Sequence, residues 1–213
     1  MDWMLKSIQV ATPKMHGDGE KTWETGIFKQ PVSGAIAVST LGLKGDGVGD
    51  TKNHGGPDKA VCCHPWQHHE YWNTYFQWNL QPGAFGENFT LAGLTEQDVC
   101  VGDIWQVGSA RFQVSQPRVP CWKQDNKLGV PNFQKKVKET DRTGFYLRVL
   151  QEGVVTPGDP IQRLERPYPK AGIIRLNRAL NEKDNPALAE EFVNLEPLAE
   201  SWRNMFQRRI RGR

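Results

Sequence analysis

Short runs of alternating apolar and polar residues dominate the first 165 positions of the chain. Residues 5–10 read Leu-Lys-Ser-Ile-Gln-Val, which is the pattern of a half-buried strand. Glycine and aspartate turns separate further strand-like runs at 27–28, 34–38, 60–63, 89–90, 104–107 and 110–115. Many short strands divided by turn signals predict a mainly β fold, either a barrel or a sandwich.

Three stretches depart from this pattern before residue 165. Residues 12–26 form a polar stretch that predicts a loop much longer than a hairpin needs, and long ordered loops tend to be functional or mobile. Residues 65–78 place apolar or aromatic side chains at steps of three or four, with Pro65 suited to a first helical turn, so we expect a helix there. Residues 133–139 give a second, weaker helical signal.

Beyond residue 163 the chain changes to helical periodicity. Pro167-Tyr168-Pro169 predicts a linker, and three helices are expected at about 171–182, 185–193 and 197–210, the second with Asn185 as its cap. We therefore expect a β domain over 1–166 and a small three-helix domain over 167–213. The last helix carries an apolar stripe made of Leu198, Trp202, Met205 and Phe206.

The last helix and the residues after it contain arginines at positions 203, 208, 209, 211 and 213. Cations near a helix C-terminus complement its dipole, so the simplest interpretation is a solvated helix end. The net charge of the 213-residue chain is only +3, which does not argue for nucleic acid as a partner and suits a small anionic ligand. A nucleic-acid-associated binding module remains an alternative, and its affinity would fall steeply with salt.

The cysteines and the start of the chain bear on where the protein works. The four cysteines, Cys62, Cys63, Cys100 and Cys121, form no Cys-x-x-Cys pair, and adjacent Cys62 and Cys63 would point to opposite faces of a strand. Residues 1–10 carry no long apolar run and no cleavage signal. We therefore expect no membrane span and a reducing cytoplasmic location.

Residues 114–121, Val-Ser-Gln-Pro-Arg-Val-Pro-Cys, carry the strongest chemical signal. Cys121 closes an apolar strand, with Pro120 directly before it and Arg118 three residues back. A nearby cation favours the thiolate, and prolines hold the turn rigid, so the motif predicts a thiolate fixed at a strand end. An isolated cysteine is more often buried and inert, so the motif needs support from elsewhere in the chain.

Two glycine turns upstream give that support. In residues 53–61 the pair Gly55 and Gly56 lets backbone amides approach a ligand closely, and His54 and Lys59 add donors. Residues 84–90 form a second glycine turn that brings a carboxylate and the amide of Asn88 into a strand. Each turn alone is a weak signal.

A competing metal site needs consideration at residues 62–69, Cys-Cys-His-Pro-Trp-Gln-His-His. His64 and His68 have the i, i+4 spacing of helical zinc ligands. Pro65 disfavours helical geometry at His64, and no second ligand cluster occurs elsewhere, so we do not predict zinc. His69 is expected to be a hydrogen-bonded core residue.

Taken in order and with their spacing, the motifs resemble the MOSC domain family, which is related to the C-terminal part of molybdenum-cofactor sulfurases. The closest likeness is to its YiiM-like branch. The residues that carry the resemblance are 25–29, 42–46, 54–60, 85–88, 102–103 and 115–121. The helical segment after Pro169 also resembles the three-helix appendage of that branch.

The resemblance implies a MOSC-type β-barrel with a few peripheral helices that binds a molybdenum cofactor (molybdopterin), with Cys121 as the ligand to molybdenum. Lys21 and Thr25, aligned by their loop position only, are similar to an early lysine and hydroxyl of MOSC reductases, where they would hold the cofactor's phosphate or assist proton delivery. The planar fork of Arg118 suits phosphate oxygens. The remaining cofactor-binding residues that we infer are Asn88, His54, Gly55, Gly56, Lys59 and Ser115.

The resemblance also implies the activity: reduction of N-hydroxylated compounds, such as the base analogue 6-hydroxylaminopurine, as a detoxification. No glycine-rich dinucleotide fingerprint follows a strand, so the electrons are expected from a separate flavoprotein reductase. Lys21 and bound water are both candidate proton donors. An alternative function is a cofactor or sulfur carrier in which Cys121 bears a persulfide.

Overall fold

A curved, eight-stranded sheet organises the protein, which we describe from a computed structural model covering residues 2–18, 22–51, 54–182 and 185–212. Neighbouring strands pair antiparallel except for one parallel pair, β7 with β8. The order across the sheet is β13 (Ile161–Glu165), β9 (Ile104–Val107), β10 (Ala110–Pro117), β11 (Phe145–Gln151), β7 (Val61–Pro65), β8 (Phe89–Ala92), β1 (Met4–Val10) and β4 (Gln30–Pro31).

The sheet rolls up until its two ends meet. Met4 of β1 forms a bridge with Pro160, directly before β13, and the Ile161 N–H donates to the Trp3 carbonyl at 2.9 Å. A rolled sheet buries one face of each strand, which explains the alternating burial along β1 and the first half of β10. The prediction of a mainly β, barrel-type fold with peripheral helices is confirmed.

Smaller sheets and helices complete the β part of the molecule. A three-stranded sheet contains β12 (Gly153–Val155), β5 (Ile36–Ser39) and β6 (Gly42–Leu43), and a hairpin pairs β2 (Lys14–His16) with β3 (Trp23–Thr25). Helix α1 (Trp66–Phe76) packs with α2 (Trp122–Leu128) and α3 (Phe133–Glu139) around a second apolar cluster that includes Trp72, Phe85 and Phe133. Short 3-10 helices η2 (Pro57–Lys59) and η3 (Glu96–Asp98) shape two of the loops.

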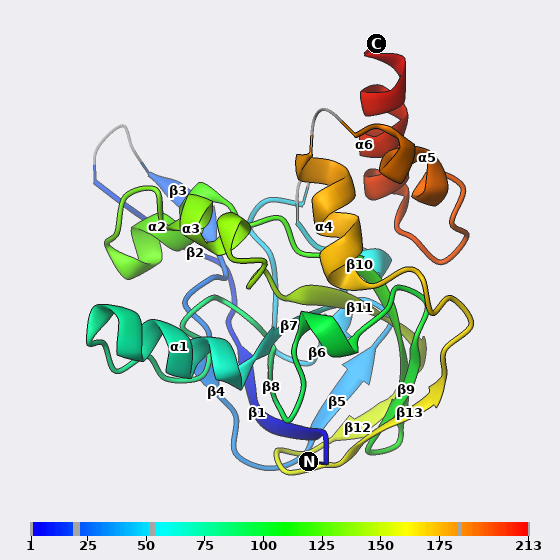
Figure 1. The fold of residues 1–213 in the computed structure, drawn as a ribbon. Helices are drawn as coiled ribbons and strands as arrows, with labels where there is room; N and C mark the ends of the chain where they lie inside the picture. The colour runs from blue at the N-terminus through cyan, green and yellow to red at the C-terminus, as the bar shows by residue number, and fades with distance from the viewer. Residues whose placement is uncertain (1, 19–21, 52–53, 183–184, 213) are drawn as a thin grey trace.

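The C-terminal helices α4 (Ile173–Asn181), α5 (Ala187–Phe192) and α6 (Glu200–Arg211) gather on one side of the sheet (Figure 1). Their buried residues Leu176, Trp202 and Phe206 belong to the same apolar core as the strands. The N–H of Ile173 also donates to the Val99 carbonyl at 3.0 Å. The three-helix segment is therefore packed onto the barrel rather than held by a free tether.

Several local predictions were wrong in detail. Residues 12–26 are not a plain loop, because cross-strand pairing of Lys14 with Thr25 and of His16 with Trp23 forms the β2–β3 hairpin. Residues 27–28 are not a strand, and the pairing with β1 falls at Gln30–Pro31 instead. Pro186, not Asn185, occupies the N-cap of α5, and α6 begins at Glu200 rather than near 197.

Candidate functional site

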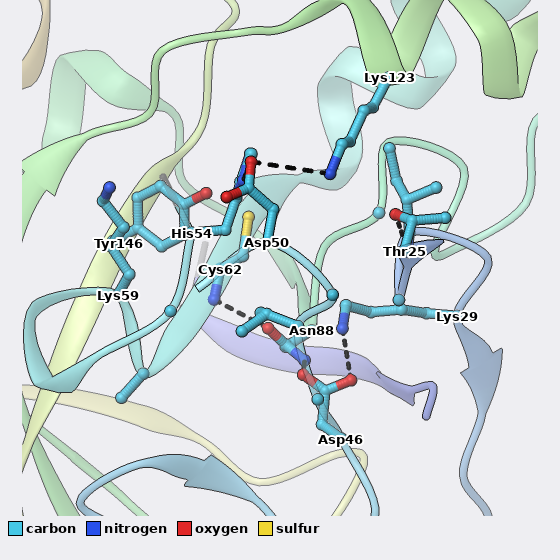
Figure 2. A pocket seen from close by; sticks show the side chains of 18 of the residues that line it. Thr25, Lys29, Asp46, Asp50, His54, Lys59, Cys62, Asn88, Lys123 and Tyr146 are labelled. Atoms are coloured by element: carbon cyan, nitrogen blue, oxygen red, sulfur yellow. Dashed lines mark hydrogen bonds and ion pairs between the residues drawn. The ribbon is translucent and has the colours of Figure 1, made fainter. Parts of the chain in front are cut away.

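A cavity of about 270 Å³ opens where five loops converge at the rim of the rolled sheet (Figure 2). Its walls come from segments 25–29, 46–50, 54–62, 86–88 and 118–123, together with Tyr146 on β11. Glycines let these loops approach each other backbone to backbone. A Cβ atom on Gly26 would lie 2.3 Å from the Gly47 carbonyl oxygen, so a larger residue there would push the two loops apart.

Cys121 stands at this cavity directly before α2, and it is partly exposed, whereas the other three cysteines are buried. Its Sγ atom lies 3.9 Å from Nε2 of His54. On the opposite side of the imidazole, Nδ1 of His54 lies 3.6 Å from a carboxylate oxygen of Asp50. Burial, followed by the positive charge of Lys123, lowers the pKa of His54 below 6.5, which keeps the imidazole uncharged at neutral pH.

Arg118 places a buried positive charge on the cavity wall. Arg118 is only 6% exposed, and its Nη2 atom donates to the Phe85 carbonyl at 2.7 Å. Its Nη1 atom is buried and has no hydrogen-bond partner among the residues that the structure describes. Burial by itself would lower the pKa of Arg118, but the nearby Cys62, Tyr146 and Cys121 raise it. The guanidinium therefore stays charged, with an open donor on the wall of the cavity.

Further cations and backbone amides surround the same space. Lys59 and Lys123 both line the cavity, and burial lowers the pKa of Lys59. The Lys123 ammonium lies 4.0 Å from Asp50. Gly55 and Gly56 adopt positive φ angles of 76° and 81°, which L-residues with a side chain rarely tolerate. Among the charged side chains of the lining, the cations Lys29, Lys59, Arg118 and Lys123 outnumber the carboxylates Asp46 and Asp50, so the lining has a net positive charge suited to an anionic ligand.

Asn88 lines the cavity but its amide serves to join three segments of the chain. Its Oδ1 accepts from the Cys62 N–H at 3.0 Å. Its Nδ2 donates to the Gln9 carbonyl at 3.2 Å and to Asp46 at 2.8 Å. Asp46 is also paired with Lys29 (Figure 2). The position of Asn88 in the cavity is as expected, and its amide hydrogen bonds are those of a scaffold residue.

The other predicted site residues fall in three places. Thr25 is buried on the cavity wall, where its hydroxyl accepts from the Ile27 N–H at 3.1 Å. Ser115 does not line the cavity, because its hydroxyl is turned to the carbonyls of Asp58 and Tyr146, at 2.6 and 3.1 Å. Lys21 lies outside the described residues.

Sequence reasoning missed four residues of this site: Asp50, Cys62, Lys123 and Tyr146. For Cys62, the alternation of side chains between the two faces of a strand was a signal that could have indicated its place in the cavity. As predicted, the adjacent cysteines face opposite ways, since Cys62 lines the cavity and Cys63 belongs to the apolar core. Burial, followed by the neighbouring Cys62, raises the pKa of the Tyr146 hydroxyl, which also lines the cavity. Tyr146 lies on a strand that the sequence pattern did not reveal.

The histidines weighed as zinc ligands are used in the interior instead. His68 Nε2 lies 2.5 Å from Glu96, and His69 Nε2 lies 3.1 Å from Glu87, as expected for a hydrogen-bonded core residue. Burial by itself would raise the pKa of Glu87, but its hydrogen bonds from His69 and the backbone lower it to about 2. Glu87 also accepts from the Gly83 and Phe85 N–H groups, so the His69–Glu87 pair holds the 83–87 turn, whose Phe85 carbonyl accepts from Arg118.

A molybdenum cofactor fits this set of side chains. A thiol at the mouth suits a soft, high-valent metal, and the open Nη1 donor of buried Arg118 suits a phosphate oxygen deeper inside. The cationic lining complements an anionic pterin phosphate.

Comparison with known proteins shows which protein family the chain belongs to. Residues 50–162 match the MOSC domain family, and residues 175–213 match the YiiM-like, 3-alpha helix domain. The chain therefore belongs to the MOSC family. Its C-terminal helices place it in the YiiM-like branch of that family.

Similar proteins extend over nearly the whole chain. YflK of Bacillus subtilis (strain 168) is 42% identical over 209 residues, which cover 97% of this chain and 94% of YflK. The crystal structure of YiiM from Geobacillus stearothermophilus superposes with a TM-score of 0.84 at 39% identity, covering 98% of this chain and 99% of that one. A protein named "Reductase" from Gibberella moniliformis (strain M3125 / FGSC 7600) is 33% identical over 162 residues, which cover 74% of this chain and 29% of that protein.

Membership of the MOSC family and the relative named "Reductase" both suggest that the protein is an enzyme. None of the helices within the described ranges is long and apolar enough to cross a bilayer.

Proposed function

We propose that the protein is a molybdenum-cofactor-dependent reductase of N-hydroxylated compounds, with Cys121 as the protein ligand to molybdenum. One observation carries the proposal: a single cavity holds the partly exposed Cys121 thiol and a buried Arg118 whose Nη1 has no partner within the described part of the chain. Membership of the MOSC family and the reductase-named relative support it.

The first task of the protein is to hold the cofactor's anionic end. Arg118 supplies the open guanidinium donor, and Lys59 adds a second cation on the same wall. The backbone at Gly55 and Gly56 passes close to this space without a side chain in the way. Thr25 contributes a hydroxyl, whose oxygen accepts from the Ile27 N–H and whose proton can be donated to a phosphate oxygen.

The second task is to bind the metal through sulfur. A cysteine ligates as a thiolate, so metal binding releases the thiol proton. The uncharged imidazole of His54, 3.9 Å from the sulfur, is the group placed to accept that proton. Asp50, on the far side of the ring, stabilises the resulting imidazolium.

The bound cofactor would supply the two-electron chemistry that cleaves an N–O bond. Converting an N-hydroxylamine to the amine and water consumes two electrons and two protons. We take base analogues such as 6-hydroxylaminopurine as the substrates and a separate flavoprotein reductase as the electron donor. Lys59 is a candidate proton source at the cavity, because burial lowers the pKa of its ammonium and so makes it a stronger acid. Lys21 is a further candidate.

The test measures molybdenum per protein by elemental mass spectrometry, for full-length protein purified anaerobically from a cofactor-sufficient host. Wild type should carry near-stoichiometric metal, and Cys121→Ala should lose both the metal and the dye-driven reduction of 6-hydroxylaminopurine. Cys100→Ala is the matched control, because Cys100 is buried away from the cavity, with its thiol directed to the Pro169 carbonyl. A metal-free wild type, or full turnover by Cys121→Ala, would refute the proposal.

The His54–Cys121 contact also favours a second function, sulfur transfer. An uncharged imidazole beside a thiol is the arrangement that generates a nucleophilic thiolate. In that case Cys121 would accept a persulfide sulfur in the absence of molybdenum. Mass spectrometry of the metal-free protein after incubation with a persulfide donor would reveal the adduct.

A further inference from the structure

A second cavity, of about 580 Å³, lies beside the first, between α6 and the rim of the barrel. Part of its lining comes from α6, through Ser201, Asn204, Met205 and Arg208, and part comes from the segment after β10, through Val119 and Trp122. We call this space the α6 groove. Cys121, His54 and Lys59 line both the α6 groove and the first cavity, so the thiol stands at their boundary.

Helix α6 is fixed to the strand that leads to Cys121. The Ala199 N–H donates to the Ser115 carbonyl at 3.0 Å, and the Ser201 hydroxyl donates to Gln116 Oε1 at 3.2 Å. Ser115 and Gln116 lie on β10, only a few residues before the thiol. Trp202 and Phe206 are fully buried in the core and anchor the helix there, and Trp202 also lines the groove. The groove wall is therefore held at a constant distance from Cys121.

The lining of the α6 groove combines a flat apolar surface with polar edges. Trp122 is 48% exposed, which is unusual for so large an apolar side chain, and Val119 is exposed next to it. On the part of the lining that comes from α6, Asn204 offers a donor and an acceptor, and Arg208 offers several donors. Neither side chain has a hydrogen-bond partner among the described residues. A space of this size is typical of small-molecule sites.

We propose that the α6 groove is the substrate compartment and that it binds a flat, nitrogen-rich heteroaromatic ring. This inference rests on the proposed function and specifies where its substrate lies. The ring packs against Trp122, its edge nitrogens bond to Asn204 and Arg208, and its exocyclic nitrogen reaches the boundary at Cys121. The three-helix segment thereby selects the substrate, while the barrel cavity holds the cofactor.

Binding to the cofactor-free protein tests this without any turnover. The probe is adenine, the amine that reduction of 6-hydroxylaminopurine would release, and the readouts are calorimetry and tryptophan fluorescence. Loss of one polar contact should weaken adenine binding about tenfold in Asn204→Ala and in Arg208→Ala. Gln207→Ala and Arg211→Ala are the matched controls on the same helix, since both side chains are exposed and neither lines the groove. They should bind adenine within about twofold of wild type.

Assays of the loaded enzyme separate substrate binding from cofactor binding. Asn204→Ala and Arg208→Ala should retain wild-type molybdenum content and raise KM for 6-hydroxylaminopurine, with little change for hydroxylamine, which is too small to span the groove. The inference would be overturned if wild type failed to bind adenine. It would also be overturned if both substitutions left adenine binding unchanged. Loss of molybdenum from both variants would also overturn it, because the groove would then belong to the cofactor. A wild type that binds adenine but contains no molybdenum would instead count against the proposed function alone.

Discussion

The sulfur of Cys121 lies 3.9 Å from Nε2 of His54, across a separation of 67 residues in the sequence. The glycine turn that carries His54 and the strand end that carries Cys121 thus meet at one point of the cavity. The imidazole is uncharged there, because burial and Lys123 lower its pKa below 6.5. An uncharged imidazole accepts a proton from a thiol, whereas a protonated one does not.

His54→Phe should therefore slow the alkylation of Cys121 by iodoacetamide in cofactor-free protein at pH 7.0, by about tenfold or more. The effect follows from losing the base that takes the thiol proton. Because burial and Lys123 lower the pKa of His54, the imidazole stays uncharged further below pH 7 than an exposed histidine would, and wild type should keep its advantage over the variant at pH 7.5 and at pH 7.0. His16→Phe, a substitution on β2 where the ring stacks on Phe28, is the matched control. Equal rates for wild type and His54→Phe would show that His54 does not activate the thiol.

Arg118→Met should abolish most anion binding in the first cavity. The substitution removes the buried guanidinium with its open Nη1 donor and leaves an apolar side chain of similar length. Because charge-assisted hydrogen bonds are the stronger kind, pyrophosphate should bind the cofactor-free protein at least about tenfold more weakly, as measured by calorimetry. Arg142→Met is the control, since that guanidinium lies over the Tyr71 ring rather than in the cavity. Unchanged pyrophosphate affinity in Arg118→Met would remove the argument for an anionic cofactor here.

Asn88→Ala should destabilise the fold rather than act on ligand binding alone. The substitution deletes three hydrogen bonds and leaves the buried Cys62 N–H without its acceptor. We expect the free energy of unfolding in urea to fall by about 3 kcal/mol. Asn79→Ala, at an exposed position with one side-chain contact to Gln81, should change it by less than about 0.5 kcal/mol. A drop as small as that of the control would mean that Asn88 has no role in joining the loops.

The sequence predicted the β character, the C-terminal helices and the place of Cys121 after the end of a strand, because each leaves a local signal. Period-two alternation marks β1 and β10, and the Pro-Cys motif marks Cys121. Close approaches between distant segments leave no such signal. The contact of Ser115 with Asp58 and Tyr146, which turns its hydroxyl away from the cavity, depends on how β10, β11 and η2 pack.

The lack of a local signal also explains why the sequence did not reveal Tyr146, Lys123 or the α6 groove. Tyr146 lies on β11, whose inward and outward positions both carry large side chains, so the alternation is hidden. Lys123 follows Cys121 by two positions, but only the start of α2 turns it toward Asp50. The α6 groove likewise exists only because the helix is hydrogen-bonded to β10 in three dimensions.

His64 is a buried residue whose titration should limit stability at acid pH. It is fully buried against Phe85, with ring centroids 4.2 Å apart, and neither ring nitrogen has a hydrogen-bond partner within the described residues. Burial, followed by the neighbouring His68 and His69, lowers the pKa of His64 well below 6.5. The folded protein therefore holds this imidazole uncharged, while the unfolded chain protonates it as the pH falls below about 6.5.

Since the unfolded state then binds the additional proton, the free energy of unfolding decreases as the pH falls. A histidine that stays uncharged in the folded state contributes a loss of about 2 kcal/mol between pH 7.5 and 5.0. His64→Leu should reduce the measured difference in unfolding free energy between these pH values by that amount, in urea titrations at both. Phe85→Leu, which replaces the aromatic ring packed against His64 but removes no titratable group, should lower stability equally at both pH values. If His64→Leu shows the full wild-type difference, another group causes the acid sensitivity, and His64 is protonated in the folded protein at pH 5.0.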